Sequence, residues 1–365
     1  DERSCMATSI ALQRVDQSCT QPTQPELPGV SLQPVADANC RRSHSALRVT
    51  VSGRELETTP VFDTYWRFAA ARQAAFLSRI AGTPAPWTDD PIISAYRFTN
   101  CYRVTDRVSQ YLIRNVIYTG SEAPDELAFR ILLFKFFNKI ETWQALVAQF
   151  GAPTLASFDV DAWADYLSNI TASGATIYSA AYVIPPPPMG KSRKHANHLL
   201  LLDHMVSDGI VDKLQAASSM HDAFEWLRSY PGIGDFLAFQ YLIDLNYSPM
   251  LSFDEMDYVV AGPGAKDGIR KCFAGATTGI EREIIQYMAD SQEEQFNRLG
   301  LRFGKLRGRR LQLIDCQNLF CETDKYARVA HPDIKGISGR TRIKQSFRVK
   351  GALDPMFYPP KWGIG

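Results

Sequence analysis

The fold is decided by residues 230–264, which read YPGIGDFLAFQYLIDLNYSPMLSFDEMDYVVAGPG. An amphipathic run over 222–229 stops at Pro231, because proline lacks the amide hydrogen that would continue a helix. The chain then turns through Gly-Ile-Gly and restarts as an apolar run over 236–245. This order of segments predicts a helix-hairpin-helix.

The hairpin turn is a candidate site for the backbone of a nucleic acid. Glycine has no side chain, so a turn made of Gly232, Ile233 and Gly234 can bring backbone N–H groups close to a ligand. These groups precede a helix start, where an anion such as a DNA phosphate is favoured. Two glycines between helices commonly form no more than a turn, and that simpler interpretation stays open.

Asp254 follows the hairpin after one helix and a short loop, twenty residues past Gly234 (254 − 234). Helix-hairpin-helix DNA glycosylases place an aspartate beside the flipped base in this way, and the chain resembles that pattern. Bifunctional members carry a lysine two residues after the second hairpin glycine, where this chain has Phe236, so a Schiff-base lyase is not expected. In the alternative interpretation, Asp254 caps a helix that starts near Glu255.

The composition indicates a soluble globular protein of one large or two small domains. Its 365 residues are 45% hydrophobic and 22% charged, which allows a substantial core and excludes disorder throughout. The net charge is +1, yet residues 301–350 contain 13 Lys/Arg and 4 Asp/Glu, a local +9 that leaves about −8 elsewhere (1 − 9). This asymmetry predicts a face that binds a polyanion.

No pattern predicts a metal site, a disulfide framework or a membrane span. The seven cysteines are odd in number, widely spaced and without a CxxC pair, so a reducing compartment is the simpler interpretation. No apolar run reaches the length of a span, and no secretion signal is visible at the N-terminus. We expect an intracellular protein, nuclear if its source is eukaryotic, with no cofactor and no membrane partner.

The organisation is that of a flexible extension, 1–55, rich in Ser, Thr, Gln and Pro, and a helical domain, 56–365. The fold class expected for this domain is mainly α, helix-hairpin-helix and DNA glycosylase-like. It contains the hairpin at 222–246 and a basic C-terminal segment at 301–365. A polyproline stretch with a basic tip predicts a surface loop. Apolar periodicity predicts further helices over 61–80, 104–118, 126–137, 143–150, 161–169, 175–182, 196–206 and 211–217.

A polar group of residues lies in YRFTNCYRVTDRVSQYL, residues 96–112. Arg103, Asp106 and Arg107 share one helical face because they are spaced three and four residues apart. A solvated face is the commoner outcome for such residues. Their density among apolar residues favours a binding role instead, in which the guanidinium groups bind phosphate and Asn100 reads a base edge.

A second polar group lies in LIDCQNLFCETDKYARV, residues 313–329, where positions 315, 318, 322 and 325 form one stripe of a helix. A salt-bridged surface explains this stripe equally well. The tail beyond residue 340 mixes cations with aromatic residues, which fits either base stacking and phosphate contact or a flap packed on the core.

Several motifs together resemble one known family. They are FTNCYRVTDRVSQYL, PGIGDFLAFQYLIDLNY, FDEMDYVVAGPGAKDGI, DCQNLFCETDKYARV and DPMFYPPKWG, and the resemblance that they indicate covers about residues 57–362. The set is similar to the α-glutamyl/putrescinyl thymine pyrophosphorylase family, also described as the 5-hydroxymethyluracil DNA kinase helical domain. The resemblance implies a DNA-modifying transferase, in which an amine displaces pyrophosphate from an activated 5-substituent of a uracil base.

Such a reaction requires cations around the leaving group, a base for the incoming amine and a base flipped out of the duplex. Its expected partners are DNA and an amine donor, either an amino acid or a polyamine. The candidate catalytic residues are Asp254, Asp257 and Lys325. The candidate substrate-binding or phosphate-binding residues are Asn100, Arg103, Arg107, Glu322 and Arg328. The candidate DNA-backbone-binding residues are Gly232, Ile233, Gly234, Gly262 and Gly264.

Two other functions fit the same residues. One is an N-glycosylase that excises a modified base, with Asp254 stabilising positive charge on the sugar. The other is a non-catalytic reader of modified DNA. Formation of abasic sites distinguishes the glycosylase, and pyrophosphate release or an amine adduct distinguishes the transferase.

Overall fold

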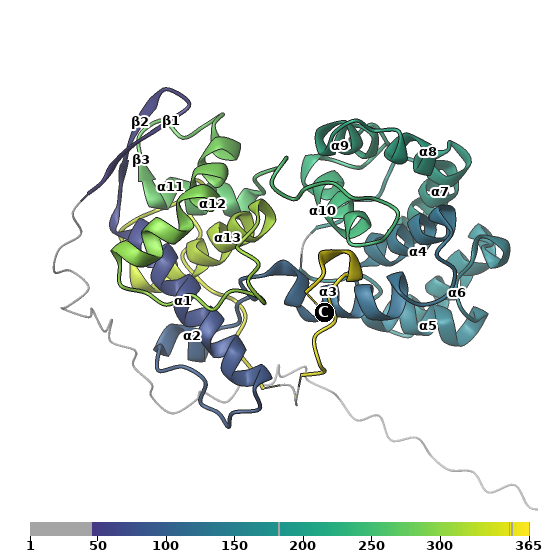
Figure 1. Cartoon of the computed structure of the whole chain (residues 1–365). Helices are drawn as coiled ribbons and strands as arrows, with labels where there is room; N and C mark the ends of the chain where they lie inside the picture. Colours follow the sequence, from purple (N-terminus) through teal and green to yellow (C-terminus); the bar gives the residue numbers. More distant parts are fainter. Residues whose placement is uncertain (1–45, 182, 350, 352, 365) are drawn as a thin grey trace, which may run out of the picture.

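The protein is built mainly from α-helices, as the sequence predicts (Figure 1). The computed structural model describes residues 46–181, 183–349, 351 and 353–364, and most of the predicted N-terminal extension lies outside them. The described helices form two lobes. The first lobe contains α1, α2, α11, α12, α13 and a small sheet, and the second contains α3 to α10. Among the described residues, no helix has the length and apolar character that a membrane span requires.

The sheet of the first lobe has three antiparallel strands in the order β1-β2-β3. β1 (Arg48–Val51) and β2 (Arg54–Thr58) form a hairpin, and β3 (Phe273–Ala274) pairs with the end of β2. This corrects the expected boundary of the flexible extension at residue 55. Residues 48–55 belong to the folded lobe because Val51 and Leu56 of the hairpin are buried in its core.

The helices of the first lobe surround α13 (Leu313–Ala330). The long helix α1 starts after Thr59, whose hydroxyl accepts a hydrogen bond from the Val61 amide and caps the helix. The other bounds are α1 (Pro60–Ile80), α2 (Pro91–Ala95), α11 (Pro263–Cys272) and α12 (Glu281–Arg298). The C-terminal 3₁₀ turn, Pro360–Trp362, lies apart from them, near α3 and the second lobe (Figure 1).

Glycines set the distance between α11 and α13. A Cβ atom at Gly268 would lie 2.1 Å from the carbonyl oxygen of Phe320, and one at Gly264 would lie 3.1 Å from the sulfur of Cys321. Because neither glycine has a Cβ, α11 packs directly against the backbone of α13. This contact also holds Lys271 of α11 against Asp324 of α13, with Nζ and Oδ1 2.9 Å apart and both side chains buried.

The second lobe is organised around two helices that are buried along most of their length, α4 (Pro124–Phe137) and α10 (Asp235–Asn246). Burial on nearly all sides explains why both sequences are almost continuously apolar. The helices around them are α3 (Arg107–Leu112), α5 (Ile140–Phe150), α6 (Val160–Ala172), α7 (Lys194–Ser207), α8 (Ile210–Gln215) and α9 (Met220–Arg228). A π-helical turn, Ile113–Ile117, continues α3.

One predicted helix does not form. The described part of 175–182 is irregular, because its backbone is bound from outside: Thr142 Oγ1 donates to the Ile177 carbonyl, and the Ser179 amide donates to the Phe137 carbonyl. That prediction is therefore wrong, and the remaining predicted helices are found with shifts of a few residues. The alternative in which Asp254 caps a helix is also not found, because near Glu255 the chain makes only a turn and the next helix begins at Pro263.

Candidate functional site at the junction of the lobes

The hairpin turn between α9 and α10 contains both predicted glycines. Gly232 has a φ of +80°, and a Cβ atom there would lie 2.7 Å from the Cα of Pro187 in the polyproline loop. Ile233 is buried and its amide donates to the Tyr230 carbonyl at 3.2 Å. Gly234 is exposed and is the N-cap of α10, with no side chain capping the helix start. The turn therefore exposes glycine backbone at a helix N-terminus, whereas the Ile233 amide is already used.

Charged residues of both signs lie near this helix start. A cavity of about 480 Å³ borders the first turn of α10 and lies between α9, residues 258–261 and the start of α12. Its charged lining includes the acidic residues Glu225, Asp235, Glu281 and Glu283 and the basic residues Arg228, Lys266 and Arg282. Asp235 itself lies in the first turn, 3.6 Å from Arg228. Because acidic and basic residues are nearly equal in number here, the cavity adds little net charge to the attraction of the helix N-terminus for a phosphate.

Phe236, which occupies the position of a lyase lysine, explains why residue 262 is a glycine. A Cβ atom at Gly262 would lie 2.9 Å from the Phe236 ring, so the glycine leaves room for this aromatic side chain. Gly262 is buried and Gly264 faces α13. The structure thus gives both glycines a packing role, and their predicted contact with DNA stays a prediction.

Arg103 is held between the two lobes by a buried ion-pair network. Its Nη1 and Nη2 atoms lie 2.7 and 2.9 Å from the two carboxylate oxygens of Asp244 on α10. Lys135 of α4 contacts the same carboxylate, with Nζ 2.9 Å from Oδ2. Burial alone disfavours a charged carboxylate, but Arg103 and Lys135 outweigh burial and lower the pKa of Asp244. This pairing favours a structural role for Arg103 over the predicted phosphate contact.

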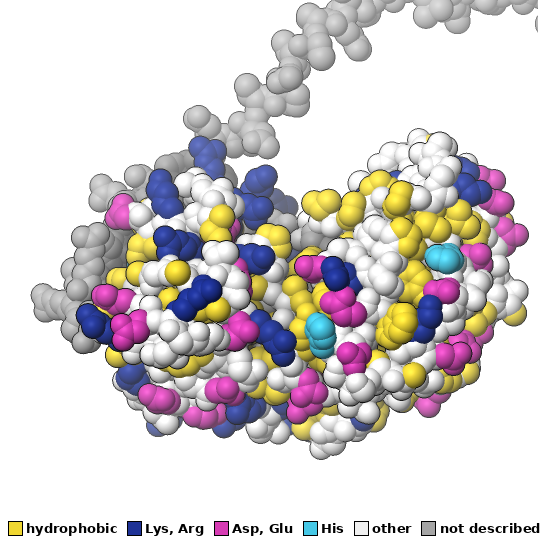
Figure 2. Space-filling view, turned by 90° about the horizontal axis from the view of Figure 1, so that it is seen from above, with side chains coloured by type: hydrophobic (Ala, Val, Ile, Leu, Met, Phe, Trp, Pro, Cys, Tyr) yellow, Lys and Arg dark blue, Asp and Glu magenta, His cyan; other side chains and the backbone are white. Residues whose placement is uncertain are grey.

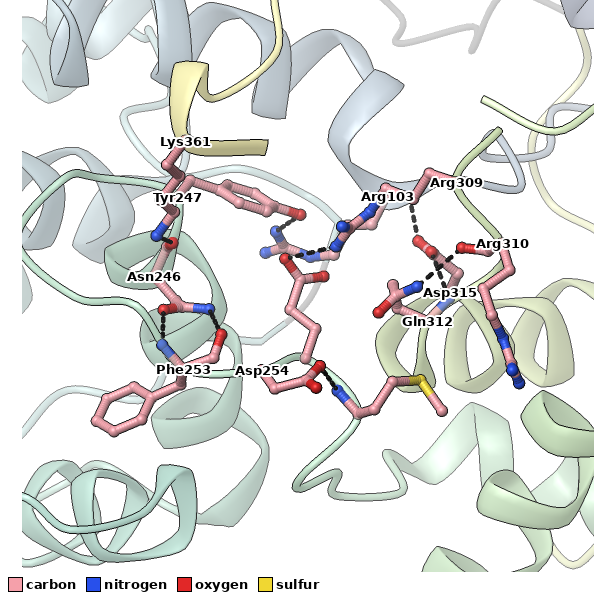
Figure 3. Close-up of polar contacts among 12 residues, drawn as sticks. Arg103, Asn246, Tyr247, Phe253, Asp254, Arg309, Arg310, Gln312, Asp315 and Lys361 are labelled. Atoms are coloured by element: carbon pink, nitrogen blue, oxygen red, sulfur yellow. Dashed lines mark hydrogen bonds and ion pairs between the residues drawn. The ribbon is translucent and has the colours of Figure 1, made fainter. Parts of the chain in front are cut away.

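A second carboxylate network lies next to Arg103 (Figure 3). Arg103, Tyr247 and Arg309 point toward one another above the loop that carries Asp254. Glu255 belongs to this network: its side chain is only 4% exposed and its Oε1 lies 3.3 Å from Nη2 of Arg309. The junction of the lobes therefore contains a buried carboxyl group one residue away from the predicted one.

The C-terminal turn covers this network. Lys361 donates from Nζ to the carbonyl oxygens of Asn246, Ser248 and Leu251, which lie where α10 ends. The Arg309 guanidinium lies over the ring of Trp362, 3.9 Å from its centroid. Of the two interpretations of the aromatic tail, these contacts favour a flap packed on the core, at least at Trp362. Burial lowers the pKa of Lys361 to about 8, although Glu255 opposes the shift.

The polar stripe of α13 faces the protein and not solvent. Asp315 is buried and accepts hydrogen bonds from the amides of Arg103 and Gln312, at 2.8 and 3.0 Å. Glu322 accepts from the Thr99 amide at 3.0 Å and pairs with Lys325 at 2.7 Å. The two polar groups singled out in the sequence thus lie against each other, because α13 binds the backbone of residues 97–103.

The other predicted residues lie in varied surroundings. Asn100 Nδ2 donates to the Thr105 carbonyl at 2.9 Å, which makes it part of the local loop. Arg107 is exposed and lies 3.8 Å from Glu141. Arg328 contacts Asp324 and donates to the Arg342 carbonyl at 2.9 Å.

Asp254 and Asp257 are both exposed and lie on one loop, and Asp254 Oδ1 accepts from the Met256 amide at 2.9 Å. They are the two predicted catalytic residues that face solvent. Within the described ranges, no group of three or more His, Cys, Asp or Glu side chains is arranged to hold a metal ion. Four cysteines are described, at positions 101, 272, 316 and 321, and all four are free thiols.

Comparison with known proteins identifies the family. A family model described as "5-hmdU DNA kinase, helical domain" matches residues 59–336, most of the chain. The chain belongs to this family. It is also 28% identical over 291 residues to a protein of Bacillus phage SP10 named "5-hmdU DNA kinase". The match covers 73% of this chain and 45% of the phage protein, so the chain spans less than half the length of that relative. No solved structure matches.

Glu255 is the candidate residue that sequence reasoning missed. Burial raises its pKa to about 7, although Arg309 opposes the shift, and burial likewise raises the pKa of Asp315 to about 6. A carboxyl group that titrates near neutral pH can both accept and donate a proton. Sequence reasoning chose the adjacent Asp254, because it matches the glycosylase pattern. Only the structure shows that the Glu255 side chain is buried and that the Asp254 side chain is exposed.

The raised pKa of Glu255 predicts a pH-dependent stability. The folded protein retains a proton on Glu255 up to about pH 7, whereas the unfolded chain releases it near pH 4.5. The free energy of unfolding should therefore fall as pH rises through this window, with a contribution from Glu255 on the order of 3 kcal/mol. Urea denaturation of the wild type and of Glu255→Gln at about pH 5 and pH 7.5 measures this contribution. Stability that does not fall with pH in the wild type, or falls equally in the variant, contradicts the prediction.

Proposed function

We propose that this chain is a DNA-modifying transferase that acts on the 5-substituent of a hydroxymethyl-type pyrimidine in DNA. The observation that carries the proposal is the family match over residues 59–336, together with a relative named for a kinase of 5-hmdU in DNA. The relative's name states that it acts on DNA and on the modified base 5-hmdU. We propose the same substrate for the present chain.

The proposed reaction displaces pyrophosphate from the activated base with an amine. The amine nitrogen forms a bond to the exocyclic carbon of the base, and the carbon–oxygen bond to pyrophosphate breaks with its electron pair on the leaving group. The proton released from the nitrogen goes to a carboxylate. Lys325 and Arg328 on α13 and the exposed Arg107 are the proposed cations for the departing pyrophosphate, which would compete with the carboxylates that these cations now contact. An amine donor and DNA are the two partners.

The loop at 254–257 provides the proposed base. Asp254 and Asp257 are exposed and accessible to a substrate, whereas Glu255 is buried beside Arg309 with a pKa of about 7. Neighbouring carboxyl groups in such different environments suit different steps of a proton transfer. Asp254 is proposed as the group that contacts the amine, and Glu255 as a group that can receive its proton.

The proposed scaffold is a glycosylase-like helix-hairpin-helix that flips the base out of the duplex. Support comes from the order of α9, the glycine turn and α10, and from the exposed, uncapped helix start at Gly234. The same scaffold supports the second candidate, an N-glycosylase with Asp254 beside the sugar. Phe236, packed on Gly262, makes a Schiff-base mechanism at the hairpin position implausible for either reaction. A non-catalytic reader of modified DNA is the third candidate.

Mass spectrometry of nucleosides tests these functions. DNA containing hydroxymethyluracil, or its pyrophosphorylated form, is incubated with the protein and with amino acids or polyamines. An amine adduct with release of pyrophosphate is the expected result, and Asp254→Asn and Glu255→Gln should each slow it by about 100-fold or more. ATP-dependent phosphorylation of hydroxymethyluracil would replace the proposed reaction by a kinase reaction. Abasic sites would establish the glycosylase, and unchanged DNA with retained binding would establish the reader.

A further inference from the structure

The cations of the basic C-terminal segment fall into two structural classes. Most of those between residues 301 and 330 contact carboxylates of the protein: Lys305 lies 2.7 Å from Glu293, Arg309 lies 3.3 Å from Glu255, and Arg310 lies 3.5 Å from Asp290. Lys325 and Arg328 contact Glu322 and Asp324 on their own helix. The local +9 of the sequence therefore overstates the charge that is free to attract a polyanion in this part of the segment.

The second class lies on residues 335–348, which we name the basic strap. It contains five cations and no acidic residue. All five are exposed: Lys335, Arg340, Arg342, Lys344 and Arg348. Among the residues that the structure describes, none of them has a carboxylate within ion-pair distance. The basic strap is thus a concentrated positive charge with no carboxylate of the described residues paired to it. Figure 2 shows one face of the molecule, on which Lys and Arg side chains lie over the first lobe with Asp and Glu side chains among them.

The backbone of the basic strap is fixed to the first lobe at three places. Near its start, the Ser338 amide donates to Asp267 of α11 at 2.7 Å. In its middle, Arg328 of α13 donates to the Arg342 carbonyl at 2.9 Å. At its end, the Phe347 amide donates to the Ala95 carbonyl of α2 at 2.9 Å, and the Arg97 amide donates to Gln345. Because the backbone is held, less conformational entropy is lost when the cations meet a ligand.

We propose that the basic strap is the main contact of this protein with the phosphate backbone of double-stranded DNA. The proposal rests on the proposed function for the identity of the polyanion. It differs from the hairpin site, where acidic and basic residues line the neighbouring cavity together and Asp235 lies 3.6 Å from Arg228. The strap binds sequence-independently, since lysine and arginine contacts to phosphate position a protein without reading bases. The basic strap also lies next to Arg328, which binds the Arg342 carbonyl, and next to the loop at 97–103, whose Arg97 amide binds the Gln345 carbonyl.

A charge-matched pair of triple variants tests the basic strap. Arg340→Gln/Arg342→Gln/Lys344→Gln removes three exposed cations whose side chains hold no described bond. The control, Lys191→Gln/Arg193→Gln/Lys213→Gln, removes three cations of the second lobe that are paired with Asp161, Asp165 and Asp208. Fluorescence anisotropy measures binding to short duplexes with hydroxymethyluracil or thymine between about 50 and 200 mM salt. Thermal unfolding of each variant verifies that it is folded.

The strap variant should lose about 2 to 3 units of slope in the plot of log K against log salt, and it should lose affinity equally on both duplexes. The control should keep most of the wild-type slope. An unchanged slope in the folded strap variant, or an equal loss in the control, overturns the proposal. Wild-type protein that binds no DNA overturns the strap proposal and the proposed function together, whereas the two preceding outcomes overturn the strap proposal alone. Binding of the wild type to anionic lipid vesicles but not to DNA also overturns the strap as a DNA site.

Discussion

Replacement of Asp244 by alanine is expected to lower the free energy of unfolding by about 3 to 5 kcal/mol. Asp244 is fully buried, and its carboxylate is shared by Arg103 and Lys135. Without it, Arg103 and Lys135 lose the buried carboxylate that both contact, and that carboxylate no longer offsets the cost of desolvating their charges. The loss should loosen the contact between α10 and the segment that carries Arg103.

Urea denaturation compares this variant with two others. Asp244→Asn keeps the shape of the side chain and removes its charge, so it should account for most of the loss. Glu141→Ala breaks the exposed pair with Arg107, whose atoms lie 3.8 Å apart, and should change stability by less than about 0.5 kcal/mol. If Asp244→Asn were as stable as wild type, the network would contribute hydrogen bonds and packing but not charge.

Replacement of Gly268 by alanine is expected to destabilise the first lobe by about 3 kcal/mol or more. The new Cβ atom would lie 2.1 Å from the Phe320 carbonyl oxygen, a backbone atom that no side-chain rotation can move. α11 would have to shift away from α13, which also separates Lys271 from Asp324. Overpacking against side chains costs about 1 to 3 kcal/mol, and a fixed backbone contact lies at the upper end.

The control for Gly268 is another glycine of the same chain. Gly234 has a φ of −82°, and a Cβ atom there meets no atom within 4 Å. Gly234→Ala should therefore change the free energy of unfolding by about 0.5 kcal/mol, the cost of a poorer N-cap. Thermal unfolding compares the stabilities of the two variants. Equal stabilities would show that α11 can move away from α13 without a loss of folding free energy.

Local patterns were sufficient to predict most of the helices. The apolar runs of α1 and α10 repeat at helical spacing, and Pro231 and the glycines mark where one helix ends and the next begins. The helix predicted over 175–182 does not form, because the Thr142 side chain of α5 binds the Ile177 carbonyl. A local sequence pattern contains no information about this contact. The alternative helix start near Glu255 is not found, because the Asp254 carboxylate accepts a hydrogen bond from the Met256 amide within a turn.

The chemical candidates depend far more on contacts that are distant in the sequence. Arg103 has the residue type and spacing of a phosphate ligand, yet its partner Asp244 is 141 residues away along the chain. Asp254 and Glu255 are neighbours in the sequence, and only burial assigns one to solvent and the other to Arg309. Counting charges along the sequence identifies a basic segment. It does not show which of its cations are paired with carboxylates and which, in the basic strap, are not.

The sequence by itself determined that the protein is mainly α, that a glycine turn joins two helices near its centre, and that it resembles one family of DNA-modifying domains. These properties follow from periodicity, turn residues and motifs, which are local or additive along the chain. Only the tertiary structure decided which charged groups are neutralised and which remain free. The physical reason is that the energy of a charge depends on its burial and on the distance to its counter-ion, and both are set by packing between residues far apart in sequence.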